Sequence, residues 1–262
     1  METDMPLAPD LDAALREFSG RDSLLVCLDF DGCVAELVAD ADSARPIPAN
    51  AQAINRLAEL RGVTLAYVSG RPLDTLRSLA EPPTDALLFG SHGAERWLGP
   101  DSPGLELNND QAAGRREVLR SLEAVAAEHD GAWVEHKPAG GAIHVRHIPD
   151  LAYGEEVLDE ARSALAMVDQ AHVKEGKQIV EAVVVQSSKG EAIEELRELS
   201  SPEAVFFAGD DVTDEHGFAV LRAGDVGVKV GPGETKAGFR ISEPSALAEV
   251  LNRIAELREQ AA

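Results

Sequence analysis

The chain has 262 residues, of which 44% are hydrophobic and 4% aromatic, a size and composition that suit one large globular domain or two modest ones. Its formal net charge is −23, from 47 acidic and 24 basic residues, which argues against nucleic acid or an anionic membrane surface as a partner. No apolar run approaches the roughly 18 residues that a membrane-spanning helix needs. We therefore expect a soluble protein whose acidity serves mainly solubility.

Cysteine usage and the first residues indicate the compartment. The two cysteines, Cys27 and Cys33, lie in and just after an apolar run, and no disulfide framework can be built from them. The opening residues, METDMPLAPDLDAALREF, are acidic and lack the apolar segment of a signal peptide. We expect a cytoplasmic protein, and a monomer or weak oligomer.

The predicted elements of the first hundred residues alternate between helix and strand. They are a helix over 9–18, a strand over 24–28, a helix over 48–60, a strand over 63–70, a helix over 72–79 and a strand over 86–90. Apolar strands that alternate with helices are typical of a parallel α/β sheet.

The pattern changes in the middle of the chain and then returns. The middle elements are a helix over 111–128, a hairpin of 133–138 and 142–148 joined by Ala-Gly-Gly, a helix over 150–167 and a hairpin of 172–176 and 177–185. After Lys189 come a helix over 189–199, a strand over 204–209, a further helix, a strand over 227–230 and a last helix over 245–259. This order predicts a Rossmann-like α/β core, 1–100 and 186–262, interrupted by an α+β cap over 101–185.

The first chemical motif is Asp29-Phe30-Asp31-Gly32, directly after five apolar residues. A buried strand that ends in two carboxylates carries a desolvation cost that packing does not explain. Asp29 and Asp31 leave the strand on the same side, because side chains alternate with period two. One can act as a nucleophile and the other as an acid and base, and together they can bind a divalent cation.

Three further motifs follow predicted core strands, where open α/β sheets bind their ligands. Ser69-Gly70-Arg71 precedes a helix and offers a hydroxyl and backbone amides to an anion. Lys189 opens another helix, a position that suits a lysine facing a phosphate and carboxylates. Asp210 and Asp211 end the strand 204–209 and repel each other unless a cation is present. Hard oxygen ligands without a His or Cys cluster favour Mg²⁺ over zinc.

Each motif alone also has an ordinary explanation. The aspartates of 29–31 are compatible with turn chemistry, Ser69 with a helix cap, and Lys189 with a solvated surface. Thr213 or Asp214 can cap the next helix. The four motifs together, in this order, are far more specific than any one of them.

In this order the motifs resemble the haloacid dehalogenase-like phosphatase superfamily. The resemblance implies that Asp29 is phosphorylated, that Asp31 is the general acid and base and ligates the metal through its backbone carbonyl, and that Ser69 and Lys189 hold the phosphate. It also implies that Asp210 completes the Mg²⁺ site, with Asp211 in support. Cys33 stands where that superfamily usually has Thr or Val, a position that is not the nucleophile.

The cap strands carry polar side chains at i, i+2 spacing, which fits either a solvated face or a face that binds sugar hydroxyls. The strings GSHGAE, EHK with HVR, GKQIVE, SSKG and GDDVTDE resemble the trehalose-phosphatase family. The resemblance runs over nearly the whole of 24–230. It implies substrate contacts by Ser69, Gly70, Arg71, His92, Glu135, Lys137, Arg146, Lys177 and Glu181. After Glu181 the chain has Ala-Val-Val where that family often has Arg-Pro, which bears on fine specificity.

The resemblance implies a Mg²⁺-dependent enzyme that hydrolyses trehalose 6-phosphate to trehalose and phosphate through an aspartyl phosphate, in trehalose biosynthesis. One alternative is a phosphatase of the same fold for sucrose 6-phosphate, mannosyl-3-phosphoglycerate or a hexose phosphate. Another is a non-catalytic sugar-phosphate sensor, which we would expect to lack the nucleophile or a metal carboxylate. This chain keeps Asp29, Asp31, Lys189 and Asp210.

Overall fold

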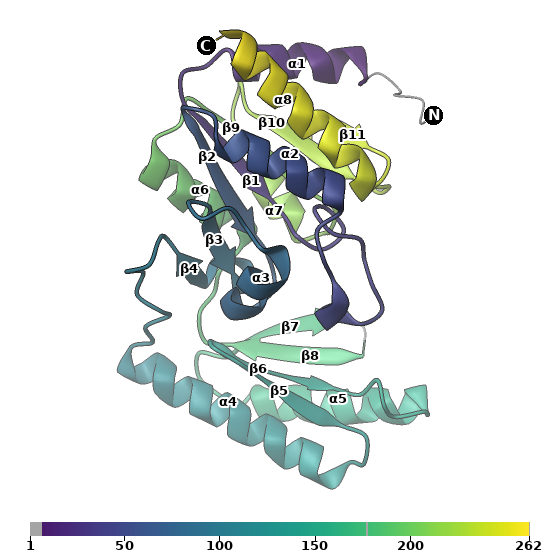
Figure 1. Cartoon of the computed structure of the whole chain (residues 1–262). Helices are drawn as coiled ribbons and strands as arrows, with labels where there is room; N and C mark the ends of the chain where they lie inside the picture. The colour runs from purple at the N-terminus through teal and green to yellow at the C-terminus, as the bar shows by residue number, and fades with distance from the viewer. Residues whose placement is uncertain (1–6, 177, 262) are drawn as a thin grey trace. The chain divides into compact units, whose positions relative to one another are not determined.

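The computed structural model describes residues 7–176 and 178–261, and it divides the chain into two compact units (Figure 1). The core unit comprises Met1–Ser102 with Ser187–Ala262, and the cap unit comprises Pro103–Gln186; the sequence had placed the insertion at 101–185. The predicted fold class, an α/β core interrupted by an α+β unit, is confirmed by the sheets described below.

The core unit is built on a seven-stranded sheet in the order β11-β10-β9-β1-β2-β3-β4. All neighbours are parallel except β3 and β4, which are antiparallel. Its strands are β1 (Leu24–Leu28), β2 (Val63–Val68), β3 (Leu87–Gly90), β4 (Glu95–Trp97), β9 (Ala204–Gly209), β10 (Val226–Val230) and β11 (Phe239–Ile241).

Strand β1 lies in the middle of this sheet and is buried along its whole length. Leu28 pairs with Tyr67 of β2 on one side and with Ala208 of β9 on the other. Because parallel strands end at the same edge of a sheet, the residues that follow β1, β2 and β9 meet there. The register therefore brings the residues after Leu28, Val68 and Gly209 together.

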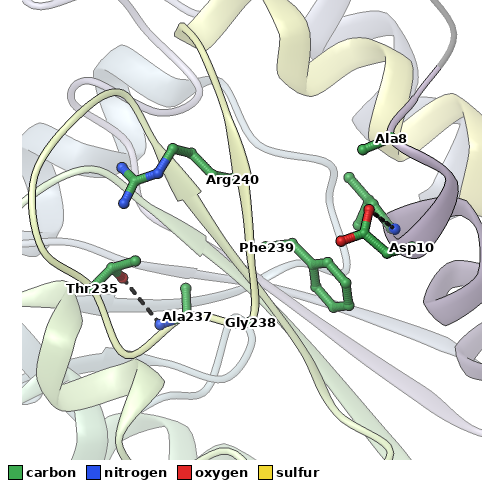
Figure 2. Close-up of a pocket in the computed structure, with 8 residues that line it drawn as sticks. Ala8, Asp10, Thr235, Ala237, Gly238, Phe239 and Arg240 are labelled. Atoms are coloured by element: carbon green, nitrogen blue, oxygen red, sulfur yellow. Dashed lines mark hydrogen bonds between the residues drawn. The ribbon is translucent and has the colours of Figure 1, made fainter.

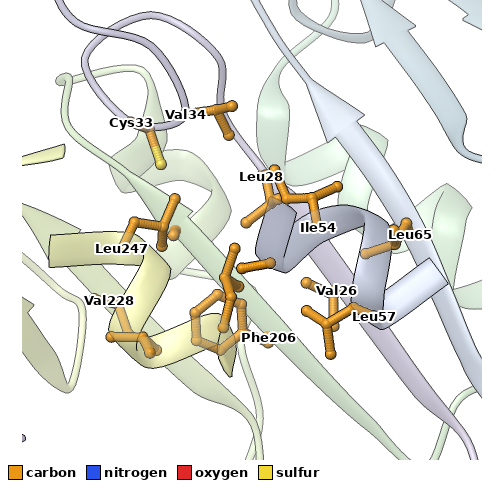
Figure 3. Packing of buried hydrophobic residues seen from close by; sticks show 14 of the residues in the cluster. Val26, Leu28, Cys33, Val34, Ile54, Leu57, Leu65, Phe206, Val228 and Leu247 are labelled. Atoms are coloured by element: carbon orange, nitrogen blue, oxygen red, sulfur yellow. The ribbon is translucent and has the colours of Figure 1, made fainter. Parts of the chain in front are cut away.

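Helices cover both faces of the core sheet. They are α1 (Pro9–Ser19), α2 (Pro48–Ala58), α3 (Leu73–Ala80), α6 (Lys189–Ser200), α7 (Asp214–Phe218) and α8 (Leu247–Ala261), with 3₁₀ turns at Ala41–Ser43, Ser91–Gly93 and Pro244–Ala246. Val26 and Leu28 pack with Ile54 of α2 and Leu247 of α8 (Figure 3). The alternate residues Leu25 and Cys27 belong to the apolar cluster on the other face, with α6 and α7. Two buried faces explain why β1 reads as a continuous apolar run.

The cap unit is an antiparallel sheet with helices on one face. Its elements are α4 (Asn109–Glu128), β5 (Trp133–Lys137), β6 (Gly140–His144), α5 (Leu151–Leu165), β7 (His172–Gly176) and β8 (Ile179–Val183), with strand order β5-β6-β8-β7. Ile143, Val180 and Ala182 pack in one cluster with Val118 of α4 and Val157 of α5. The alternate residues of these strands therefore lie on the opposite face of the sheet.

The structure differs from the sequence-based prediction at two kinds of place. Strands β4 and β11 were not predicted, because three-residue strands at or near a sheet edge carry too little pattern. Gly140 and Gly141, predicted as the hairpin turn, lie inside β6 instead. A Cβ at Gly140 would lie 1.9 Å from the backbone carbonyl oxygen of Ala182 in β8, so only glycine fits at that position of the strand. Within 7–176 and 178–261, every helix is too short or too polar to cross a membrane.

Candidate active site

A buried lysine joins two buried aspartates at the carboxyl edge of the core sheet. Lys189, the first residue of α6, places Nζ 2.8 Å from Asp29 Oδ1 and 2.7 Å from Asp214 Oδ1. The three residues are 2%, 4% and 0% exposed, respectively. Charged residues are rarely buried unless they are paired. The arrangement therefore excludes the solvated-surface alternative for Lys189.

Asp210 brings a third carboxylate to the same place. Oxygen atoms of Asp29, Asp210 and Asp214 lie within 4.8 Å of one another, a grouping able to hold a metal ion. The backbone accommodates Asp210 through Gly32, which has φ +72° and whose Cβ, if present, would lie 2.1 Å from Asp210 Oδ2. Lys229 of β10 also donates to the backbone carbonyl of Asp210. The loops after β1 and β9 are thus fitted to each other.

The electrostatics of this cluster are unbalanced. Burial raises the pKa of the Asp29 carboxyl well above its usual range, and Asp214 raises it further against the opposing effect of Lys189. Burial and Asp214 likewise raise the pKa of Asp210 to about 6. Burial alone would lower the pKa of Lys189, but Asp29 and Asp214 outweigh it and keep the ammonium charged. Lys189 and Lys229 both lower the pKa of Asp210, yet burial and the other carboxylates outweigh them. A further positive charge would therefore stabilise the anionic forms.

The carboxylate grouping contains Asp214, an aspartate that the sequence had not assigned to a metal. The sequence had assigned Asp211 to the metal site, but its side chain is exposed and Oδ1 accepts the N–H of Val212. Asp214 stands in the cluster, and its Oδ2 accepts the N–H of Asp211 at 2.9 Å. Asp214 was considered only as a helix cap. The position of the Asp214 side chain depends on Gly209, because a Cβ at residue 209 would lie 2.3 Å from the Asp214 carboxyl carbon.

Asp31 forms a two-pronged ion pair with an arginine. Arg71 Nε and Nη2 donate to the two carboxylate oxygens of Asp31, both at 2.6 Å. The guanidinium also lies 5.5 Å from the centroid of the Phe30 ring. A two-pronged pair of this kind fixes the plane of the carboxylate. The sequence had predicted Arg71 as a substrate contact, and in this structure its partner is the predicted acid and base.

Ser69, Gly70 and His92 meet beside this pair. Ser69 follows β2, is buried, and its Oγ accepts the N–H of Arg71 at 3.2 Å. The ring of His92 lies against Gly70, where a Cβ would meet its Cε1 at 2.6 Å. The sequence predicted an anion site at the N-terminus of α3. A carboxylate of the chain itself lies there, since the N–H of Leu73 donates to Glu95 Oε2 at 3.2 Å. Sequence reasoning gave no role to Glu95.

The cap unit gathers the polar residues predicted to bind sugar on one face of its sheet. Lys137 Nζ donates to Glu181 Oε2 at 2.6 Å, reaching from β5 across β6 to β8. Glu135 lies 3.0 Å from His144 Nε2, and Arg146 lies 3.0 Å from His144 Nδ1. Lys177 falls outside the described residues.

A separate surface hollow of about 350 Å³ lies in the core unit (Figure 2). Asp10 and Leu11 of α1 line it opposite Thr235 and Arg240. Its polar side chains are engaged locally: Asp10 and Thr235 accept nearby N–H groups, and Arg240 donates to the carbonyls of Gly231 and Gly233. The hollow shares no residue with the carboxylate cluster, and its chemistry points to no ligand.

The donor set of the cluster suits a hard divalent cation. Asp29, Asp210 and Asp214 offer carboxylate oxygens, the ligands that Mg²⁺ prefers. Burial, with the neighbouring carboxylates, raises the pKa values of Asp29 and Asp210, and a bound cation would favour their anionic forms. The residues therefore fit the metal that the sequence predicted.

Comparison with solved structures identifies the class. The C-terminal domain of a C. albicans trehalose-6-phosphate phosphatase matches with a TM-score of 0.76 at 20% identity, covering 97% of this chain and 99% of that one. That likeness shows the fold. That fold is an α/β core interrupted by an inserted α+β cap unit.

Sequence comparison then gives the family. The model of the trehalose-phosphatase family matches residues 27–246. The trehalose-6-phosphate phosphatase of Escherichia coli (strain K12) is 34% identical over 222 residues, 82% of this chain and 80% of that protein. The trehalose-phosphate phosphatase of Mycobacterium avium (strain 104) is 32% identical over 280 residues, 98% of this chain and 69% of that protein. The chain belongs to the trehalose-phosphatase family.

Proposed function

We propose that this protein hydrolyses trehalose 6-phosphate to trehalose and phosphate in trehalose biosynthesis, with Mg²⁺ as its cofactor. The observation that carries the proposal is the buried cluster of Lys189 with Asp29, Asp210 and Asp214 at the carboxyl edge of the core sheet. Family membership supplies the substrate class. Phosphoryl transfer needs positioning and charge neutralisation above all, and this cluster provides both.

The chain's own residues perform the chemistry in two steps. In the first, a carboxylate oxygen of Asp29 bonds to phosphorus as the bond from phosphorus to the sugar oxygen breaks. Asp31, protonated once it leaves its two-pronged pair with Arg71, gives its proton to that oxygen. In the second, Asp31 takes a proton from a water molecule, which attacks phosphorus and frees Asp29. Lys189 holds Asp29 in place and offsets the charge of the phosphate. Ser69 contributes its hydroxyl to phosphate binding.

The metal would be held by Asp29, Asp210 and Asp214, with the backbone carbonyl of Asp31 as the ligand that the family resemblance implies. When bound, it supplies the positive charge that lets anionic Asp29 approach a phosphate dianion. Lys229 supports this arrangement by donating a hydrogen bond to the backbone carbonyl of Asp210.

The sugar would be recognised by Glu135, Lys137, Arg146 and Glu181 of the cap unit, with Lys177 implied by the resemblance alone. Carboxylates and cations together can both accept from and donate to sugar hydroxyls. His92, beside Gly70, is proposed to contact substrate from the core unit.

A panel of sugar phosphates tests the substrate. We expect phosphate release to be fastest, by kcat/KM, with trehalose 6-phosphate, and slower with sucrose 6-phosphate, mannosyl-3-phosphoglycerate and glucose 6-phosphate. Release should need Mg²⁺ and should stop in Asp29→Asn, which keeps the shape of the side chain. Preference for another member of the panel would replace the substrate and leave the phosphatase chemistry intact.

A non-catalytic sensor remains the alternative of a different class. The C-terminal domain of a Candida albicans trehalose synthase regulatory protein matches this chain with a TM-score of 0.73 at 13% identity, so the fold is also found in a protein named as regulatory. The grouping of Lys189 with Asp29 and of Asp29 with Asp210 supports the enzyme, and Asp31 is present as well, paired with Arg71. Sugar-phosphate binding without phosphate release would favour the sensor.

A further inference from the structure

A histidine without an assigned role connects two of the proposed sugar contacts on the cap sheet. His144 ends β6, and its Nε2 lies 3.0 Å from Glu135 Oε2 on β5. Its Nδ1 lies 3.0 Å from Nη2 of Arg146, two residues further on. The imidazole therefore stands between a carboxylate and a guanidinium, with one ring nitrogen toward each.

The chemistry of the two partners decides the protonation of the ring. A guanidinium is always charged and has only donors, so Nδ1 of His144 must accept its hydrogen bond. A carboxylate has only acceptors, so Nε2 must carry the proton and donate to Glu135. Both contacts are satisfied only by the neutral Nε2–H tautomer. The hydrogen bond from His144 also lowers the pKa of Glu135, as expected when a carboxylate accepts a hydrogen bond.

An indole ring fixes the orientation of this imidazole. Trp133 pairs with His144 across the two strands, and their rings stack with centroids 4.0 Å apart and planes at 4°. The guanidinium of Arg146 also lies over the indole, 5.8 Å from its centroid. His144 is 4% exposed. Its ring is thus held as a rigid connector whose two nitrogens are already used by its neighbours.

We propose that neutral His144 is a positioning residue for sugar recognition: it holds the carboxylate of Glu135 and the guanidinium of Arg146 in a fixed relative orientation for the hydroxyls of the substrate's sugar. This inference rests on the proposed function, because it assumes that Glu135 and Arg146 meet a sugar. It adds a residue that acts through both and touches neither the phosphate nor the reacting atoms.

Two substitutions distinguish the hydrogen bonds of His144 from the space that its side chain fills. His144→Leu removes both hydrogen bonds, whereas His144→Gln keeps one donor and one acceptor on the same side chain. A matched control is His136→Leu: His136 lies on the opposite face of β5, is exposed, and its Nε2 contacts Glu123 of α4 at 2.7 Å. Each variant is assayed with trehalose 6-phosphate and with p-nitrophenyl phosphate, an ester that has no sugar.

We expect His144→Leu to raise KM for trehalose 6-phosphate about tenfold or more, the cost of losing hydrogen bonds to charged groups. Its kcat/KM for p-nitrophenyl phosphate should stay within about twofold of the unsubstituted chain, because the core chemistry is unchanged. His144→Gln should recover most of the loss in KM, and His136→Leu should show none. An unchanged KM in His144→Leu, equal losses on both substrates, or failure of His144→Gln to recover KM would overturn the inference.

Nitrogen-15 NMR of the unsubstituted chain gives a readout that does not depend on any variant folding. At pH 7 the His144 ring should show a protonated Nε2 and an unprotonated Nδ1; a doubly protonated ring or an Nδ1–H tautomer would refute the proposal. Failure of the proposed function looks different. The unsubstituted chain would then hydrolyse p-nitrophenyl phosphate and another sugar phosphate better than trehalose 6-phosphate, and the KM comparison would be made on that sugar.

Discussion

Lys189→Met should be among the most destabilising substitutions in the core unit. Methionine keeps the length of the side chain but removes the charge that Asp29 and Asp214 share, at 2.8 Å and 2.7 Å. Both carboxylates are almost completely buried, so water cannot replace the lost partner. Removing one member of a buried ion pair leaves an uncompensated charge in a medium that solvates it poorly.

The magnitude follows from this burial. Breaking a buried pair costs about 3–5 kcal/mol, a large part of the roughly 5–15 kcal/mol by which domains are stable. The loss should also depend on pH. Burial already raises the pKa of Asp29, and Lys189 opposes this, so without Lys189 Asp29 takes up a proton more readily in the folded state than in the unfolded state. The variant therefore gains stability as pH falls, and its deficit at pH 5 should be smaller than at pH 7.5.

Urea unfolding in the presence of EDTA measures this directly, by comparing the free energy of unfolding of the two chains at both pH values. Lys236→Met is the matched control, since Lys236 is exposed, and its effect should stay within about 0.5 kcal/mol. A deficit of Lys189→Met below about 1 kcal/mol at pH 7.5, or one that grows as pH falls, would refute the reasoning.

Three further predictions concern the metal and the acid and base. The pKa of Asp210 is raised to about 6, so the stability that its protonated carboxyl gives the metal-free fold is lost as pH rises through that value. Calorimetry should therefore show that Mg²⁺ raises Tm more at pH 7.5 than at pH 5. An equal rise at both pH values would count against this prediction. Gly32→Ala should weaken Mg²⁺ binding at least about tenfold by titration calorimetry, because its Cβ would strike Asp210, whereas Gly231→Ala, with φ +75° and open space around its Cβ, should not. Arg71→Met removes both bonds to Asp31 and should lower kcat about tenfold or more in phosphate-release assays; an unchanged kcat would show that Asp31 needs no such support.

Much of the core site was predictable, because its residues sit where strands end. Asp29, Ser69 and Asp210 follow buried apolar runs, and parallel pairing of β1 with β2 and β9 necessarily brings those ends together. The presence of Asp214 in the cluster was not predictable in this way. Beyond the strand, the turn decides which side chain points inward, and the deciding feature was the space left by Gly209.

The partners of the site residues were harder to predict than the residues themselves. Arg71 pairs with Asp31 over 40 residues of sequence, and Glu95 reaches the start of α3 from β4. Such contacts depend on how loops approach each other, which periodicity does not record. His144 was read only as one member of a polar face, because its role depends on its stacking with Trp133 across the strand pair.

The central claim is that Asp29 is the nucleophile, and trapping the acyl phosphate tests it most directly. Enzyme turning over trehalose 6-phosphate with Mg²⁺ is quenched in acid and reduced with borohydride, which converts a phosphorylated aspartate to homoserine. Peptide mapping by mass spectrometry should find homoserine at position 29 and nowhere else, and only when substrate was present. Unmodified Asp29 in enzyme that releases phosphate at full rate, or homoserine at another aspartate, would contradict the account.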